Sequence, residues 1–213
     1  MFQKAMETAV SPATIILASA SPRRQELVSM LGLPVLIQPS EADENTPEDW
    51  TPERIVEELA QRKAKAVWDL REGADHAVVV GSDTLVALDG RILGKPRDED
   101  HAAEMLRMLS GRTHEVYTGL CCIGHARSKT AGAGPETIVG HTVSKVTFRP
   151  MSEEEIRAYV KTGDPLDKAG AYGIQGIGSV FIEKIEGDFY SIMGLPMNLL
   201  YQMLLKFGVS PFQ

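Results

Sequence analysis

A strand-to-helix turn within residues 14–27 constrains the fold of this chain more than any other feature. Residues 15–17 form an aliphatic run that suits one buried strand, and Pro22 suits the first position of a helix ending at Gly32. The side chains at the turn are those of Ser19, Ser21 (the expected N-cap), Arg23 and Arg24. Helix N-termini and arginine forks both bind phosphate oxygens, so the turn favours a polyphosphate site. A capped helix with two solvated arginines is the alternative that the turn alone leaves open.

The composition is that of a globular protein with an acidic balance. The chain has 213 residues, 43% of them hydrophobic, enough for a core in one large domain or two small ones. Its 22 Lys and Arg against 29 Asp and Glu give a net charge of −7, which disfavours general attraction to nucleic acid or an anionic membrane. No stretch approaches the roughly 20 apolar residues of a membrane span, and the first residues do not form a secretory signal. We therefore expect a cytoplasmic protein.

The two cysteines of the chain, Cys121 and Cys122, are adjacent. Neighbouring side chains on a strand point to opposite faces, so a disulfide between them would need a distorted peptide. No metal-binding spacing accompanies them. We expect two buried thiols in a reducing compartment.

Strands and helices alternate along the chain. The hydrophobic pattern predicts strands at 15–17, 35–38, 76–81, 84–88, 91–93, 115–124, 137–148 and 179–185, and helices at 22–31, 51–67, 99–109, 152–160 and 195–207. The helix at 51–67 carries its apolar residues on one face, namely Ile55, Val56, Leu59, Ala60, Ala64 and Val67. Asp89-Gly90 is a strong hairpin signal, and 40–50 and 126–135 are expected to be loops. Hairpins together with helix-connected strands imply a mixed sheet of class α/β or α+β.

Residues that suit phosphate chemistry occur at three further places. Asp83 and Thr84 follow the buried run at 76–81, and a carboxylate at the end of a central strand lies where open α/β sheets form binding crevices. The others are Asp43 and Glu44 in the acidic loop, Lys63 on the next helix and Lys95 after the hairpin. Together they supply carboxylates for a divalent metal and cations for phosphate oxygens. Each alone is better explained as a cap, a turn residue or a solvated surface charge.

A glycine-rich segment at 164–178 contains Gln175 between several possible bends. So many glycines around polar residues suggest that a ligand approaches the backbone closely. A long connecting loop is the alternative, although loops of this length in compact domains are usually functional.

These segments together carry a family resemblance. They are SASPRR at 19–24, DE at 43–44, KA at 63–64, SDT at 82–84, GKP at 94–96, GRTHEV at 111–116, PLDKAGAYGIQG at 165–176 and GLP at 194–196. In this order, from residue 15 to about 205, they resemble the Maf family of nucleoside triphosphate pyrophosphatases. The resemblance implies an elongated mixed sheet with flanking helices around a central cleft, related to the inosine triphosphate pyrophosphatase fold. It implies one domain over 1–213, or two lobes around one cleft, with residues 1–13 as an N-terminal extension.

The resemblance also implies an activity and residue roles. The activity is hydrolysis between the α and β phosphates, giving monophosphate and pyrophosphate. Asp83 would be the general base or would orient a metal-bound water, and with Glu44 and Asp43 it would hold magnesium or manganese. Contacts to the triphosphate would come from Ser19, Ser21, Arg23, Arg24, Lys63 and Lys95, and base choice from Arg23, Thr84 and Gln175. Gln175 would contact either the base or the metal-bound water. His114 is expected to be structural, because the carboxylates already supply the catalytic groups.

Thr84 separates branches of the family. With GRTH at 111–114 and Tyr190-Ser191, it is similar to the branch that removes dTTP and UTP from the nucleotide pool. The sister branch, which prefers 7-methyl-GTP, tends to carry glutamine there. A threonine hydroxyl can hydrogen-bond a pyrimidine edge, which favours the first branch. CTP derivatives and modified uridine nucleotides stay open as further substrates. The alternatives are the 7-methyl-GTP enzyme, or a nucleotide-sensing regulator of cell division and septum formation without significant turnover. We expect a homodimer, and neither a nucleic acid nor a membrane partner.

Overall fold

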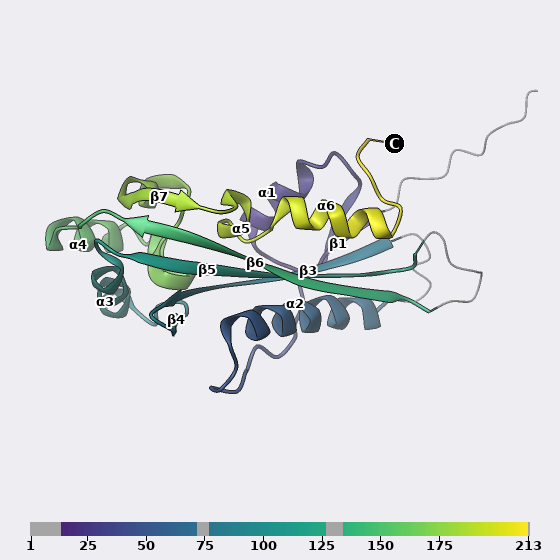
Figure 1. Cartoon of the computed structure of the whole chain (residues 1–213), viewed down its shortest axis with the longest axis horizontal. Helices are drawn as coiled ribbons and strands as arrows, with labels where there is room; N and C mark the ends of the chain where they lie inside the picture. The colour runs from purple at the N-terminus through teal and green to yellow at the C-terminus, as the bar shows by residue number, and fades with distance from the viewer. Residues whose placement is uncertain (1–13, 72–76, 127–133, 213) are drawn as a thin grey trace, which may run out of the picture.

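One mixed sheet runs the length of the elongated molecule (Figure 1). The structure is a computed structural model that describes residues 14–71, 77–126 and 134–212. Its strands are β1 Thr14–Leu17, β2 Val35–Ile37, β3 Ala77–Leu88, β4 Arg91–Leu93, β5 Thr113–Gly124, β6 Glu136–Phe148 and β7 Ile182–Glu186. Its helices are α1 Pro22–Ser29, α2 Pro52–Asp69, α3 Glu99–Leu109, α4 Glu153–Lys161, α5 Phe189–Ile192 and α6 Met197–Lys206, with 3-10 helices η1 Asp164–Asp167, η2 Ala169–Ala171 and η3 Gly176–Phe181. The expected N-terminal extension at 1–13 and most of the loop at 126–135 lie outside the described residues.

The strand order is β2-β1-β3-β5-β6-β7, with β4 paired to β3. β1 runs parallel to β2 and to the first part of β3, whereas the pairs β3–β5, β5–β6, β6–β7 and β3–β4 are antiparallel. The sheet is therefore mixed, and the predicted fold class is confirmed.

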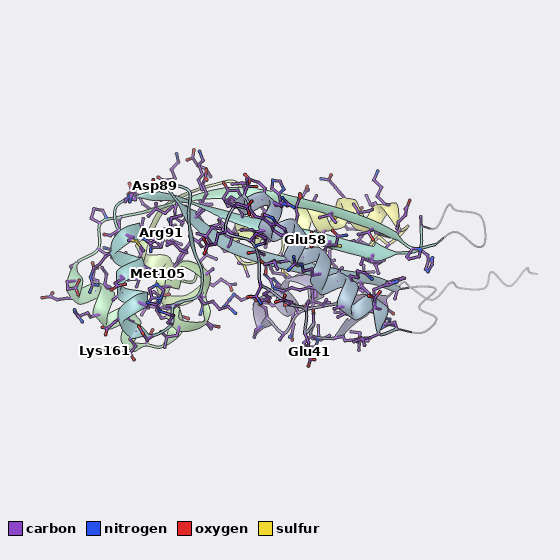
Figure 2. All side chains as sticks on the ribbon, turned by 90° about the horizontal axis from the view of Figure 1, so that it is seen from below. Glu41, Glu58, Asp89, Arg91, Met105 and Lys161 are labelled. Atoms are coloured by element: carbon purple, nitrogen blue, oxygen red, sulfur yellow. The ribbon has the colours of Figure 1, made fainter. Side chains whose placement is uncertain are left out.

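Helices cover both faces of the half of the sheet that contains β1 (Figure 1). α2 packs on one face in a cluster with Ile16, Val79 and Cys121, and α1 and α6 pack on the other around Val80 and Cys122. At the other end of the sheet, α3, α4 and the 3-10 helices enclose a separate apolar cluster. Figure 2 shows the two halves from below, with Glu41 and Glu58 in the first and Met105 and Lys161 in the second.

Local sequence signals formed several elements as predicted. The six apolar residues expected on one face of α2 are all buried, and the Thr51 hydroxyl caps that helix by accepting from the Arg54 N–H. α3 has the predicted bounds, and α4 starts with a complete capping box between Ser152 and Glu155. Asp89 and Gly90 have φ of 50° and 76°, the two positive values of a type I′ hairpin turn.

The cysteines are also as predicted. Both thiols are free and buried, and Cys121 and Cys122 belong to apolar clusters on opposite faces of the sheet. Burial raises the pKa of Cys121 to about 12, so this thiol stays protonated at neutral pH.

Other predicted boundaries were wrong. The strands predicted at 76–81 and 84–88 are one strand, β3, so Asp83 lies in its middle and not at its end; residue 76 lies outside the described residues. The strand predicted at 179–185 starts only at Ile182, because 176–181 form η3. The closing helix divides into α5 and α6, and the first helix ends at Ser29, before the turn at Gly32.

Candidate active site

The candidate site lies where one edge of β3 is unpaired. β1 pairs with β3 as far as Val80, and β4 pairs with it from Val86 onward. Residues 81–85 therefore pair only with β5 within the described chain. Because successive side chains of a strand alternate, Asp83 points to the α2 face and Thr84 to the face of α1 and α6. β1 thus ends beside this part of β3, which is where open α/β sheets form binding crevices.

Two glycines bring α2 onto the sheet near Asp83. A Cβ at Gly81 would overlap the carbonyl oxygen of Ala60, and a Cβ at Gly119 would overlap that of Val56. The helix backbone therefore lies directly on β3 and β5, and it places the Lys63 ammonium 2.6 Å from Asp83 Oδ1. Both side chains of this ion pair are only 13–14% exposed.

Glu44 completes a charged group around Lys63. Its Oε1 lies 2.7 Å from Lys63 Nζ, so one ammonium joins two carboxylates. The hydrogen bond from Lys63 is the main cause of a lowered pKa for Glu44, and the positive charges of Lys95 and Arg24 add to it. Lys95 is exposed, and its positive charge acts on Glu44.

The loop carrying Glu44 is fastened to α2 on both sides of that residue. Arg62 Nη1 donates to the carbonyl of Asp43 at 3.3 Å and to that of Asn45 at 2.8 Å. The Asp43 carboxylate is exposed and accepts from the backbone and side chain of Asn45. The structure therefore brings Glu44, but not the Asp43 carboxylate, into contact with Lys63.

Arg24 approaches β3 from the other face. Its Nε donates to the Gly194 carbonyl at 2.7 Å, Nη2 to Thr84 Oγ1 at 3.1 Å and Nη1 to Ser19 Oγ at 3.4 Å. Burial lowers the pKa of Arg24, while the negative charge of Asp83 acts in the opposite direction. The guanidinium thus lies near Asp83 and is held by protein contacts on all its nitrogens.

The turn before α1 differs in detail from the prediction. Ser21 does occupy the N-cap position, but its hydroxyl makes no capping hydrogen bond. Its N–H donates instead to Ser19 Oγ at 3.2 Å. Ser19 Oγ therefore links the turn to Arg24, and the Ser21 hydroxyl takes no part in capping the helix.

A small pocket opens on the Thr84 side of the sheet. It lies between α1 and the 3-10 helices, and it combines two cationic side chains with apolar ones. Its lining residues are Arg23, Thr84, Val86, Val116, Lys168, Ala169, Tyr172, Gly173, Ile174, Ile192 and Met193. Gln175 is partly buried and follows Ile174, so it is next to this wall without lining it.

Lys168 is the cation that sequence reasoning missed. Its ammonium is bound by Asp164 and by Asp167 at 2.7 Å, and its side chain lines the pocket. Asp167 and Lys168 are adjacent within the glycine-rich segment at 164–178. This pair of opposite charges is the sequence feature that could have indicated Lys168 as a site residue.

His114 lies outside the charged group, as expected for a structural residue. It is 1% exposed, its Nε2 is 2.8 Å from the Tyr172 hydroxyl, and its ring packs edge-on against Phe148. Burial lowers its pKa to about 4, so the imidazole is neutral at pH 7.

Comparison with known proteins identifies the family. The family model for Maf-like proteins matches residues 14–207, which include every candidate residue named above. The chain belongs to the Maf family. Relatives named dTTP/UTP pyrophosphatase are 49% identical in Moorella thermoacetica (92% of this chain, 96% of the relative), 46% in Symbiobacterium thermophilum (93% and 96%) and 47% in Bacillus cereus (92% and 96%).

Solved structures give a more distant likeness to this Maf protein. The Ham1 protein of Staphylococcus aureus matches with a TM-score of 0.44 and 16% identity over 79% of each chain. This likeness adds nothing to the family assignment.

No three His, Cys, Asp or Glu residues within 14–71, 77–126 and 134–212 are grouped so as to hold a metal ion. No helix in these same segments is long and apolar enough to cross a membrane.

Proposed function

We propose that this Maf protein hydrolyses dTTP and UTP to the nucleoside monophosphate and pyrophosphate, as a house-cleaning enzyme of the nucleotide pool. One observation carries the proposal: the Lys63 ammonium is shared by Asp83 and Glu44 at the unpaired edge of β3, beside a pocket. The names of relatives that are 46–49% identical over more than nine-tenths of this chain support the choice of these two nucleotides.

The triphosphate would lie along this edge between cations from both faces of the sheet. Arg24 reaches the edge from one face and Lys63 from the other, and Lys95 lies near Glu44. Arg23, at the pocket, and the hydroxyls of Ser19 and Ser21 would complete the phosphate contacts. Cations placed in advance stabilise the charge that develops on phosphate oxygens in the transition state.

Asp83 would act as general base. A water would attack the α phosphorus, and Asp83 would take its proton while the bond from this phosphorus to the α,β-bridging oxygen breaks. Pyrophosphate would then leave with the electron pair of that bond. Before substrate binds, the ion pair with Lys63 keeps Asp83 in place; a phosphate oxygen that attracts the ammonium would leave the carboxylate free to accept the proton.

The carboxylates present fit a divalent cation, magnesium or manganese. Asp83 and Glu44 already hold one positive charge, the Lys63 ammonium, between them. Magnesium binds through one or two carboxylates plus substrate phosphates, so a cage of three protein carboxylates is not required. Such an ion would neutralise phosphate oxygens and lower the pKa of a water. Asp43 would contribute only if its carboxylate left Asn45.

Base choice would be made in the pocket. Thr84 and Arg23 line it, and Gln175 follows the wall residue Ile174. The apolar side chains of Val86, Val116 and Met193 would contact the 5-methyl group of thymine next to these polar groups. Sites that hydrogen-bond a base can discriminate by orders of magnitude.

The test is a panel of triphosphates incubated with the purified protein and magnesium, with release of pyrophosphate measured. We expect kcat/KM for dTTP and UTP to exceed that for ATP, GTP and 7-methyl-GTP. Repeating the reaction in heavy-oxygen water should place the label in the monophosphate, as attack at the α phosphorus requires. A preference for 7-methyl-GTP would move the protein to the sister branch, and binding without turnover would replace the enzyme by a nucleotide sensor.

The homodimer implied by the family resemblance also stays a prediction. Light scattering on the purified protein would measure a mass of twice 23.3 kDa if it holds.

A further inference from the structure

One wall of the pocket includes the backbone of Gly173. Gly173 and Ile174 line the pocket and belong to the irregular stretch between η2 and η3. The chain turns sharply before this stretch, since Gly170 and Ala171 both have positive φ. The position of this wall determines the shape of the pocket beside Thr84. Side chains can adjust to a ligand by changing rotamer, but backbone groups cannot.

A single phenol outside the pocket holds this wall. Tyr159 of α4 is 3% exposed, and its hydroxyl accepts from the Gly173 N–H at 3.1 Å. The same hydroxyl donates to Asp164 Oδ2 at 2.6 Å, and Asp164 Oδ1 accepts from Lys168 Nζ at 3.1 Å. Tyr159 thus connects the wall at Gly173 to η1 and, through Asp164, to the pocket cation Lys168.

The other end of the loop at 173–178 meets the same hydroxyl. A Cβ at Gly178 would stand 2.5 Å from Tyr159 Oη and 2.6 Å from the carbonyl oxygen of Gly173. The loop therefore closes around the phenol with no space left for a side chain at Gly178. Burial is the main cause of a raised pKa for Tyr159, so the hydroxyl keeps the proton that it donates to Asp164.

We propose that Tyr159 is a positioning residue for base selection, whose hydroxyl keeps the backbone wall at Gly173 where it discriminates between nucleobases. The proposal rests on the proposed function, because it concerns the substrate of that same site. Neither Tyr159 nor Gly173 has a hydrogen bond or ion pair to Lys63, Asp83 or Glu44. Removing the hydroxyl should therefore change which base fits more than it changes the rate of phosphate chemistry.

Tyr159→Phe tests this, because it keeps the ring and removes the hydroxyl. The matched control is Tyr117→Phe, which removes another largely buried hydroxyl that donates to a carboxylate, Glu115, at 2.7 Å, but which lines no part of the pocket. We expect the ratio of kcat/KM for UTP over ATP to fall about tenfold in Tyr159→Phe, with kcat for UTP within about threefold of wild type. The ratio should be unchanged in Tyr117→Phe.

An unchanged ratio in folded Tyr159→Phe, or an equal loss for both nucleotides, would overturn the proposal. If Tyr159→Phe does not fold, Gly178→Ala moves the same loop from its other end and must lower the ratio likewise. Failure of the proposed function is distinguishable, since wild-type protein would then release no pyrophosphate from UTP.

Discussion

Lys63 of α2 and Asp83 of β3 form an ion pair of 2.6 Å at the place where the helix backbone rests on the sheet. The two residues are 20 positions apart in sequence, and contact of α2 with Gly81 brings them together. The Asp83 carboxylate is therefore held in place before any substrate binds. Removing the charge of this carboxylate should lower the rate of catalysis and leave the fold unchanged.

Asp83→Asn keeps the shape of the side chain and removes its charge and basicity. We expect kcat for UTP to fall by about a hundredfold or more, the usual scale for loss of a general base, with unfolding little changed. Steady-state kinetics and thermal unfolding measure the two effects. Asp89→Asn is the control, because it removes an exposed carboxylate at a turn that asparagine also suits. Near-normal kcat in Asp83→Asn would rule out the assigned base.

Arg23 and Arg24 should differ although they are neighbours. Replacing either by Ala should lower kcat/KM, by the equivalent of about 2–4 kcal/mol. Only Arg24→Ala should also lower the free energy of unfolding, by about 1–3 kcal/mol, because it removes two charge-assisted hydrogen bonds, to the Gly194 carbonyl and to the Thr84 hydroxyl. Kinetics and denaturant unfolding of both variants check this. Equal losses of stability would mean that the Arg24 contacts contribute nothing to the fold.

Gly81→Ala should be strongly destabilising. The added Cβ would overlap the Ala60 carbonyl and lie 2.7 Å from the Ala64 nitrogen, both of them backbone atoms that side-chain rotation cannot move. We expect a loss of about 3 kcal/mol or more in the free energy of unfolding, at the upper end for overpacking. Gly94→Ala is the control, because a Cβ there meets nothing within 4 Å and the residue has no positive φ. Equal stability of the two variants would show that α2 does not rest on Gly81.

His114 should make stability fall with acid. Its pKa is lowered by burial from 6.5 to about 4, so below pH 6.5 the unfolded chain binds a proton that the folded chain does not. The loss grows as pH falls from 6.5 to about 4 and is then complete. Between pH 7 and pH 5 it amounts to about 2 kcal/mol. Denaturant unfolding at both pH values should show this loss in wild type and in His101→Gln, a partly exposed histidine. The same pH change should cost His114→Phe about 2 kcal/mol less than wild type, and an equal loss would contradict the assignment.

The parts of the fold that short-range chemistry decides could be predicted from sequence. The apolar face of α2, the capping box of α4 and the turn at Asp89-Gly90 each depend on residues within a few positions of one another. β3 could not be predicted as one strand, because SDT at 82–84 interrupts its apolar run. Distant partners satisfy these side chains: the carbonyls of Gly119 and Gly194 for Ser82, Lys63 for Asp83 and Arg24 for Thr84.

The structure brings together several of the residues proposed for the candidate site and leaves others apart. Ser19, Arg24 and Thr84 are joined by hydrogen bonds, and Glu44 and Asp83 share Lys63. Asp43 and Glu44 are neighbours in sequence, yet the turn with Asn45 directs the Asp43 carboxylate elsewhere. The role of Lys168 depends on the path of three 3-10 helices, which a glycine-rich sequence does not specify.

The contact of α2 with Gly81 and Gly119 has a consequence for how this protein tolerates mutation. Most helices are held away from a sheet by side chains, so a change of side-chain volume alters the separation. Here the backbone of α2 contacts the backbone of β3 and β5 directly. The side-chain volume at this contact can change only if Gly81 or Gly119 is replaced. Substitutions that change the volume of surrounding apolar side chains should therefore leave the distance between α2 and the sheet unchanged. The distance between Lys63 and Asp83 should then stay the same as well.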